Sequence, residues 1–373
     1  MNRTEFIPMV DLQKEIDLLK APLLKEMKTV LKSGEYVLGA KGEELENQIA
    51  AYTGTAYAVG VANGTDALYL SLKALNIGPG DEVITTPFTF FATAEAIAQT
   101  GAVPVFADIK EQTYTIDPEK IKEALTPKTK AVIIVHLFGK AADMEDILAL
   151  AEKYNLKVIE DACQAVGTKV EDKKAGGIGN VGCFSFFPSK NLGALGDGGM
   201  IVTNEQNICD NVRELRNHGS HMRYQHSSIG VNSRLDEMQA AVLLVKLKYL
   251  ELFLHKRKEI AKRYTEQLNR YVKTPETREQ EGRTYHQYCI ETAQRDELAA
   301  HLKKSGIASA VYYPVPLHLQ KAFHYLGYQK GRFPVSEKTA ERILALPIFP
   351  ELSIEKQNYI ISNVIQFFDQ QKD

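Results

Sequence analysis

Seven short apolar runs between residues 57 and 204 are the feature that most constrains the fold of this chain. Each run is four or five residues long and mostly apolar without strict alternation, and amphipathic segments separate several of them. Continuous apolar strands that alternate with helices are typical of a mostly parallel sheet covered on both faces. The sequence therefore predicts an α/β fold. The expected strands are 57–61, 83–86, 103–107, 131–135, 156–159, 182–186 and 199–203, and the expected helices between them are 65–76, 92–100, 118–125 and 143–154.

Helices are also expected before this alternating region. Pro22 is a suitable first residue for a helix that Gly34 ends, since proline is favoured at helix starts and glycine just past helix ends. Leu45, Ile49 and Tyr52 repeat at helical spacing and predict a second helix before the first strand.

The second half of the chain predicts a smaller domain. A long helical tract from about residue 235 to 271 is expected to link the two parts, and a Pro-rich loop and further helices follow it. We place a large α/β domain at residues 1–244, including the N-terminal helices, and a small α+β domain at 245–373. The helices expected in the small domain are 295–305, 336–344 and 354–369.

Bulk properties exclude several functional classes. The 373-residue chain has a formal net charge of −2, so nothing in its charge favours nucleic acid or an acidic membrane as partner. No apolar run approaches the ~20 residues that span a bilayer, and the N-terminus lacks a signal-peptide pattern. We therefore expect a cytoplasmic protein with reduced thiols and no metal site. The cysteines are Cys163, Cys183, Cys209 and Cys289, none of them spaced as a metal-ligand or redox pair.

Lys190 is the lysine that most suggests chemistry. It lies between an apolar run that begins at Val181 and a glycine-rich turn, with no acidic neighbour before Asp197. A lysine in a partly desolvated pocket has a lowered pKa, which makes its neutral, nucleophilic form accessible. Lys190 is therefore a candidate Schiff-base lysine. The alternative is a lysine that caps a loop.

Two polar groups stand at strand ends. Asn63-Gly64-Thr65-Asp66 lies between a strand and a helix, where free backbone N–H groups suit a phosphate, unless Thr65 is simply a helix cap. Asp161 follows a buried strand and needs a cationic partner, which a protonated pyridine nitrogen would supply. The alternative for Asp161 is a salt bridge to an arginine or lysine.

An aromatic segment completes this set. Phe88, Phe90 and Phe91 follow the second expected strand, and one of them could stack on a flat ring while the other two join the core. A phosphate cup, a stacking ring, an acid and a lysine are what pyridoxal phosphate requires. The glycines at 176–179 lack the strand–turn–helix context of a dinucleotide site.

The motifs also carry a resemblance. ANGTDAL, TTPFTFFAT, VHLFG, IEDACQA, FSFFPSKNLGALGDGGM, RNHG, IGVNSRLDEMQAA and PLHLQ make the whole chain similar to the DegT/DnrJ-type sugar aminotransferases. These are pyridoxal phosphate enzymes of fold type I, with an aspartate aminotransferase-like fold. One departure is Lys140, where the family usually has glutamine. We expect it to change a loop without loss of activity.

The resemblance implies a role for each matching residue. Lys190 would form the Schiff base and shuttle protons, Asp161 would pair with the pyridine nitrogen, Gln164 would bind the ring hydroxyl, and Phe90 would stack on the ring. Asn232 would reach the phosphate bound by the other subunit of a homodimer. The other implied phosphate ligands are the backbone N–H groups of Gly64, Thr65 and Asp66 and the hydroxyl of Ser185.

The implied reaction moves an amino group from L-glutamate to a ketosugar linked to UDP or dTDP. Residues 223–236 resemble members that aminate C3 of the sugar more than those that aminate C4, so a 3-ketosugar is favoured. Tyr313, His318 and His226 are candidate sugar ligands, although each histidine could instead be a surface or capping residue. The alternatives are a 4-ketosugar aminotransferase, another fold-type I activity such as a lyase, and a non-enzymatic regulatory protein. The near-neutral charge argues against DNA binding.

Overall fold

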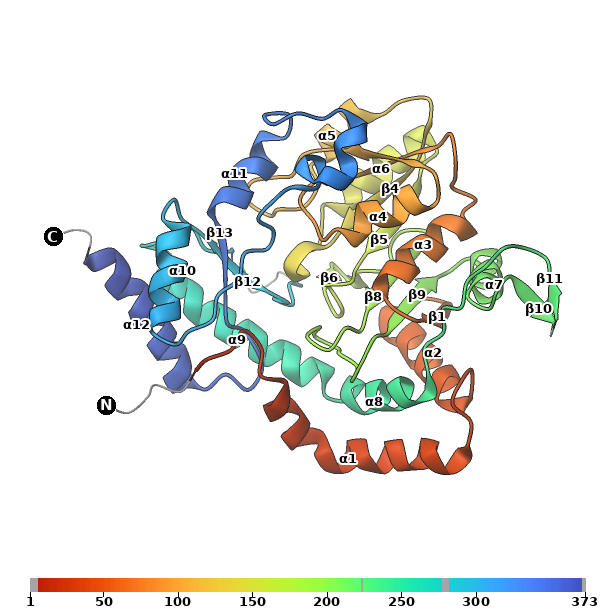
Figure 1. The fold of residues 1–373 in the computed structure, drawn as a ribbon, viewed down its shortest axis with the longest axis horizontal. Coiled ribbons are helices and arrows are strands. Elements are labelled where there is room, and N and C mark those ends of the chain that lie inside the picture. The colour runs from red at the N-terminus through yellow and green to blue at the C-terminus, as the bar shows by residue number, and fades with distance from the viewer. Residues whose placement is uncertain (1–5, 223, 277–281, 371–373) are drawn as a thin grey trace.

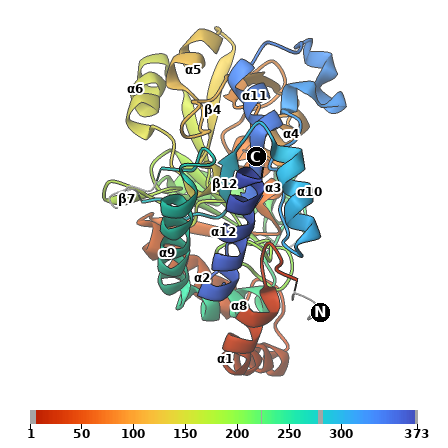
Figure 2. The same ribbon diagram turned by 90° about the vertical axis from the view of Figure 1, so that its left-hand side faces the viewer.

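The computed structural model describes residues 6–222, 224–276 and 282–370. A large sheet with helices on both faces forms one part of the molecule, and helices α9, α10 and α12 pack around a short strand pair in the other (Figures 1 and 2). The strands of the large sheet are β1 (Tyr57–Val61), β2 (Glu82–Thr85), β3 (Val103–Phe106), β4 (Thr129–Val135), β5 (Lys157–Asp161), β8 (Val181–Ser185) and β9 (Gly199–Thr203).

The remaining elements have these bounds. The short strands are β6 (Lys169–Val170), β7 (Lys173–Lys174), β10 (Ser220–Met222), β11 (Gln225–His226), β12 (Tyr288–Glu291) and β13 (Ile343–Leu346). The helices are α1 (Leu12–Ser33), α2 (Ala40–Thr53), α3 (Gly64–Ala74), α4 (Ala92–Gln99), α5 (Pro118–Ala124), α6 (Met144–Tyr154), α7 (Gln206–Leu215), α8 (Glu237–Leu247), α9 (Leu250–Leu268), α10 (Arg295–Lys304), α11 (Pro334–Arg342) and α12 (Ile354–Asp369). Segments of 3₁₀ helix span Leu137–Gly139, Leu317–Leu319 and Lys321–Leu326.

The large sheet confirms the predicted α/β fold. Within the described residues its seven strands run in the order β1-β9-β8-β5-β4-β2-β3, and each lies at an expected strand. Strand β9 is antiparallel to both of its neighbours, whereas the pairs from β8 to β3 are parallel. The sheet is therefore mostly parallel, as predicted.

Side chains of β4 show why the strands are apolar throughout. Ala131 and Ile133 pack into a core with α3, α4 and α7, while Val132 and Ile134 pack into a second core with α5 and α6. Successive residues of a strand point to opposite faces, so a sheet covered on both faces favours apolar residues on both sides of its strands.

Helix α1 departs from the sequence prediction. Pro22 does not start it, because the helix begins at Leu12 with Asp11 as N-cap and continues through the proline to Gly34. An internal proline removes one backbone hydrogen bond and costs about 3 kcal/mol. Leu19 and Leu23 lie on either side of Pro22 and are buried in a cluster with residues of α8 and α9, which offsets that cost.

Two other boundaries were also wrong. The tract predicted at 235–271 is split into α8 and α9, which meet at Lys248 and Tyr249. The helix predicted at 336–344 begins earlier, with Pro334 in its first turn, and ends at Arg342. The apolar run Ile343–Leu346 forms strand β13 instead, since it pairs antiparallel with β12.

A separate hydrophobic cluster forms the core of the C-terminal part. It combines residues of β12 and β13 with residues of α9, α10 and α12, and Ile7 from the N-terminal segment joins it. The domain boundary predicted between residues 244 and 245 falls inside α8, and the division into two domains stays a prediction.

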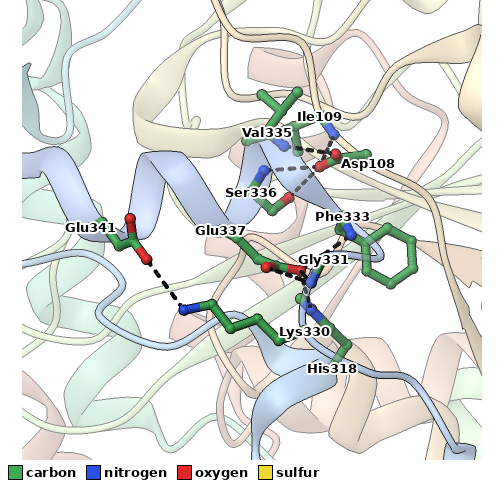
Figure 3. Close-up of polar contacts among 10 residues, drawn as sticks. All are labelled: Asp108, Ile109, His318, Lys330, Gly331, Phe333, Val335, Ser336, Glu337 and Glu341. Carbon is green, nitrogen blue, oxygen red and sulfur yellow. Dashed lines mark hydrogen bonds and ion pairs between the residues drawn. The ribbon is translucent and has the colours of Figure 1, made fainter.

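Asp108 joins the end of β3 to α11. Its carboxylate accepts hydrogen bonds from the Val335 and Ser336 N–H groups, both at 3.0 Å, and from the Ser336 hydroxyl at 2.6 Å (Figure 3). Free N–H groups at a helix start are stabilised by such an acceptor. Asp108 therefore caps α11, although it lies more than 200 positions earlier in the chain.

We predict that Asp108→Ala lowers the free energy of unfolding by about 2 kcal/mol, because the first turn of α11 loses its acceptor. Urea denaturation would measure the change. The matched control is Lys330→Ala, which removes only the exposed Lys330–Glu341 contact at 3.7 Å and should have almost no effect (Figure 3). Equal stabilities of the Asp108 and Lys330 variants would contradict this role.

Candidate active site

The carboxyl ends of β1, β2, β5 and β8 bring the candidate residues together. Strand β9 lies between β1 and β8 and is antiparallel to both, so β1 points in the same direction as the parallel strands. Asn63 follows β1, the Phe88–Phe91 segment follows β2, Asp161 ends β5, and Ser185 ends β8. In open α/β sheets this edge is where ligands bind.

The loop after β1 forms a cup suited to an anion. Asn63, rather than Thr65, caps α3, because its side chain accepts a hydrogen bond of 2.8 Å from the Asp66 N–H. The N–H groups of Gly64 and Thr65 have no recorded acceptor within the described part of the chain and stay available for a phosphate. The Asp66 N–H, the third predicted phosphate ligand, is already used by Asn63.

Gly64 packs directly against Ser185. A Cβ atom at position 64 would lie 2.7 Å from the Ser185 Cβ and 2.9 Å from the Cys163 sulfur, so only glycine fits there. Ser185 therefore packs against the start of α3. The structure thus groups Gly64, Thr65 and Ser185, all predicted phosphate ligands.

Asp161 is a buried carboxylate that neutral groups hold in place. Its side chain is 6% exposed, and it accepts hydrogen bonds from the Thr93 hydroxyl at 2.8 Å and from the Cys163 N–H at 3.2 Å. Across residues 6–222, 224–276 and 282–370 no lysine or arginine forms a recorded ion pair with it. The salt-bridge alternative is therefore not observed, and a protonated ring nitrogen would supply the missing charge.

Thr93 and Thr89 are site residues that the sequence analysis did not identify. The Thr93 hydroxyl donates to Asp161, which as a carboxylate can only accept, and the Thr89 and Thr93 hydroxyls are 3.0 Å apart. Thr89 immediately precedes Phe90, so this pair links Asp161 to the predicted stacking ring. The TTPFTFFAT motif contains both threonines but gives no indication of their partner.

Glu160, next to Asp161, has a different role. It is fully buried and accepts from the N–H groups of Gly176, Ile178 and Gly179 at 2.6–2.7 Å and from His136 Nε2 at 2.8 Å. Burial by itself would raise the pKa of Glu160. The contact with His136 and the backbone hydrogen bonds outweigh burial and hold that pKa below its usual value. The glycines at 176–179 therefore bind a carboxylate of the chain itself.

Lys190 lies in the loop between β8 and β9. Its N–H donates to the Phe187 carbonyl at 2.8 Å, which forms a tight turn. Burial lowers the pKa of the Lys190 amine, and the nearby Cys163 and Asp161 only partly oppose that shift. A lowered pKa favours the neutral amine, the form that attacks a carbonyl carbon.

Gln164, Tyr313 and Phe90 lie together at this site. The Gln164 amide accepts from the Phe138 N–H at 2.9 Å and donates to the Tyr313 hydroxyl at 2.9 Å. The rings of Tyr313 and Phe90 have centroids 6.2 Å apart, and Phe90 is 57% exposed. Phe88 is fully buried and Phe91 partly buried, so Phe90 is the ring most available for stacking.

Three predicted residues lie apart from this group or face elsewhere. Asn232 is exposed, and His226 belongs to the β10–β11 hairpin that projects beyond α7 (Figure 1). His318 is fully buried, and its Nε2 lies 3.0 Å from Glu337 Oε1 (Figure 3). The roles of these three residues as ligands stay predictions.

The departure at Lys140 lies outside the group as well. It directly follows the 3₁₀ segment Leu137–Gly139 and lines a cavity of about 720 Å³ together with Asp143 and Lys169.

The described residues contain no cluster of histidine, cysteine or carboxylate side chains that could hold a metal ion. No helix in the described part of the chain is long and apolar enough to cross a membrane. Cys163, Cys183, Cys209 and Cys289 are free thiols in this structure.

These groups fit pyridoxal phosphate. The N–H groups of Gly64 and Thr65 suit its phosphate, the buried Asp161 carboxylate suits its ring nitrogen, and the Lys190 amine suits its aldehyde. A family model of DegT/DnrJ/EryC1/StrS aminotransferases matches residues 18–365. The chain belongs to this family. Its members depend on pyridoxal phosphate, so the protein is an aminotransferase with that cofactor and a fold of type I.

Three similar proteins cover almost the whole chain. A pleiotropic regulatory protein of Geobacillus stearothermophilus is 47% identical over 97% of this chain and 98% of its own length. The UDP-N-acetyl-3-dehydro-alpha-D-glucosamine 3-aminotransferase of Acidithiobacillus ferrooxidans is 46% identical over 98% of this chain and 99% of its own. The crystal structure of S. venezuelae DesV with a ketimine intermediate is 40% identical, with a TM-score of 0.96 over 98% of this chain and 99% of that one.

We predict that Lys190→Met stabilises the cofactor-free protein at neutral pH, because it removes an amine that burial disfavours. The difference from wild type should shrink as the pH rises toward ~10.4, the ordinary lysine value. In that range the unfolded wild-type chain holds a proton on Lys190 that the folded chain has lost, so wild-type stability rises with pH. Urea denaturation at several pH values would measure the difference in unfolding free energy between Lys190→Met and wild type. A difference that stays constant with pH would contradict the lowered pKa of Lys190.

Proposed function

We propose that the protein converts a nucleotide-linked 3-ketosugar into the 3-aminosugar, with L-glutamate as amino donor. The observation that carries the proposal is the position of Lys190, whose amine has a pKa lowered by burial, near the buried carboxylate of Asp161. The relative from Acidithiobacillus ferrooxidans, a UDP-sugar 3-aminotransferase, supports the C3 position, as does the resemblance of residues 223–236.

Each residue has a defined task in this reaction. Pyridoxal phosphate supplies an aldehyde that takes up the amino group and a ring that withdraws electrons from the reacting carbon. The Lys190 Nζ would take the proton from the glutamate α-carbon and later deliver one to the sugar carbon that receives nitrogen. Asp161, oriented by Thr93, would keep the ring nitrogen protonated.

Two alternatives remain in view. The first is amination at C4, which differs only in the sugar carbon presented to Lys190. For either position, both UDP-linked and dTDP-linked sugars are candidate substrates. A regulatory role is the second alternative, because the Geobacillus stearothermophilus relative bears a regulatory name. The net charge of −2 disfavours DNA binding, whereas the desolvated Lys190 favours catalysis.

We predict that Lys190→Ala lowers the rate of aminosugar formation by at least about a thousandfold, since the group that moves the proton is lost. Lys140→Gln is the matched lysine control and should keep the wild-type rate. The assay would offer each of the UDP-linked and dTDP-linked 3-ketosugars and 4-ketosugars together with L-glutamate. It would follow the release of 2-oxoglutarate and locate the new amine by NMR.

Amination at C4 would refute the C3 assignment, and a colourless protein that retards DNA would favour regulation.

We propose further that the enzyme is a homodimer whose active sites are shared. The β10–β11 hairpin and the loop after it expose large apolar side chains, with Met222 62% and Ile229 94% exposed. Near the site Phe187 is 53% exposed as well. These exposed apolar side chains are candidates for burial at a subunit interface. Across such an interface Asn232 would reach the partner's phosphate, and His226 the partner's sugar.

Mixing two inactive variants tests the shared site. Lys190→Ala and Asn232→Ala subunits should each show strongly reduced activity, the second through at least about tenfold weaker cofactor binding. A mixed dimer would contain one site with both native residues, so re-assembly from equal amounts should restore up to about a quarter of wild-type activity.

The control mixture is Lys190→Ala with Asp161→Ala. Both residues belong to the same subunit's site, so no mixed dimer would regain a complete site and no activity should return. Equal recovery in both mixtures, or an Asn232→Ala variant with unchanged cofactor affinity, would contradict the role of Asn232. Sedimentation would confirm or exclude the dimer directly.

A further inference from the structure

The hydrogen bond between Gln164 and Tyr313 fixes the orientation of both groups. The Phe138 N–H can only donate, so the atom 2.9 Å from it is the Gln164 oxygen, and the amide nitrogen faces Tyr313. An amide nitrogen can only donate, so the Tyr313 oxygen accepts the bond of 2.9 Å between them.

This arrangement leaves two protons unused. The Gln164 nitrogen has a second N–H, and the Tyr313 hydroxyl keeps its own proton. No acceptor for either is recorded among the described residues. Burial raises the pKa of Tyr313 well above its usual value, so the phenol stays protonated and remains a donor. Within the described part of the chain, two neighbouring donors therefore have no recorded acceptor, and both groups are only partly buried.

The position of Tyr313 places these donors at the cofactor site. Its ring is 6.2 Å from Phe90, the predicted stacking residue, and 6.3 Å from the buried Phe88. The charge of Asp161 is close enough to contribute to the raised pKa of Tyr313. The Leu317 N–H donates to the Pro87 carbonyl at 2.8 Å, which anchors the Tyr313 loop to the loop that carries Phe90.

We propose that Tyr313 is a catalytic residue that donates a hydrogen bond to the ring oxygen of pyridoxal phosphate, beside the donor from Gln164. This assigns Tyr313 to the cofactor instead of the sugar, and it rests on the proposed position of Gln164 at that oxygen. Two donors stabilise negative charge on the oxygen and so weaken its hold on the proton that it shares with the Lys190 nitrogen.

The test is a pH titration of the visible absorption band of the holoenzyme, with neither sugar nor amino donor present. Tyr313→Phe removes the donor, so the shared proton is held more tightly and the apparent pKa of the band should rise by about one unit. Tyr312→Phe is the matched control: it also loses a hydroxyl, but no hydrogen bond of that hydroxyl is recorded among the described residues. Its titration should match wild type.

A graded change gives a second measurement. Fluorotyrosine at position 313 makes the phenol a stronger donor, so the apparent pKa should fall instead of rise. An unchanged titration in both Tyr313 proteins, with a raised KM for the sugar in Tyr313→Phe, would overturn the proposal and return Tyr313 to the sugar. Because the titration involves no substrate, its result is independent of whether the proposed 3-ketosugar is correct.

Discussion

The buried, unpaired charge of Asp161 is the constraint on which the site depends. A carboxylate that is 6% exposed and held by two neutral donors is costly to bury without a cation. Burial also disfavours the charged form of Lys190 in the same site. Among the described residues no cation pairs with Asp161, and burial opposes the charge of Lys190, whereas a ligand with a basic ring nitrogen and an aldehyde satisfies both groups. The rest of the fold supplies the stability that this arrangement costs.

The pleat of β5 separates two neighbouring acids. Glu160 points to the side of α5 and α6, where four hydrogen bonds satisfy it, whereas Asp161 points to the side of α4 and meets Thr93. Alternation along a strand makes this division unavoidable once the sheet is covered on both faces. One acid therefore stabilises a loop, and the next is left for the cofactor.

Local signals predicted the fold wherever packing agreed with them. The seven apolar runs became seven strands, and the first helix ends at Gly34 as predicted. The errors occurred where packing overruled a local signal. Helix α1 passes through Pro22 because Leu19 and Leu23 are buried beside it, and residues 343–346 pair with β12 instead of extending a helix.

The sequence by itself determined which chemical groups stand at the strand ends: an amine, an acid, an aromatic segment and a helix start. It determined this because strand ends and helix starts are local properties of a chain. Only the tertiary structure decided their partners, such as Thr93 for Asp161, Tyr313 for Gln164 and Glu337 for His318. Those contacts join residues up to about 150 positions apart, and the direction of each hydrogen bond depends on neighbours that no local pattern specifies.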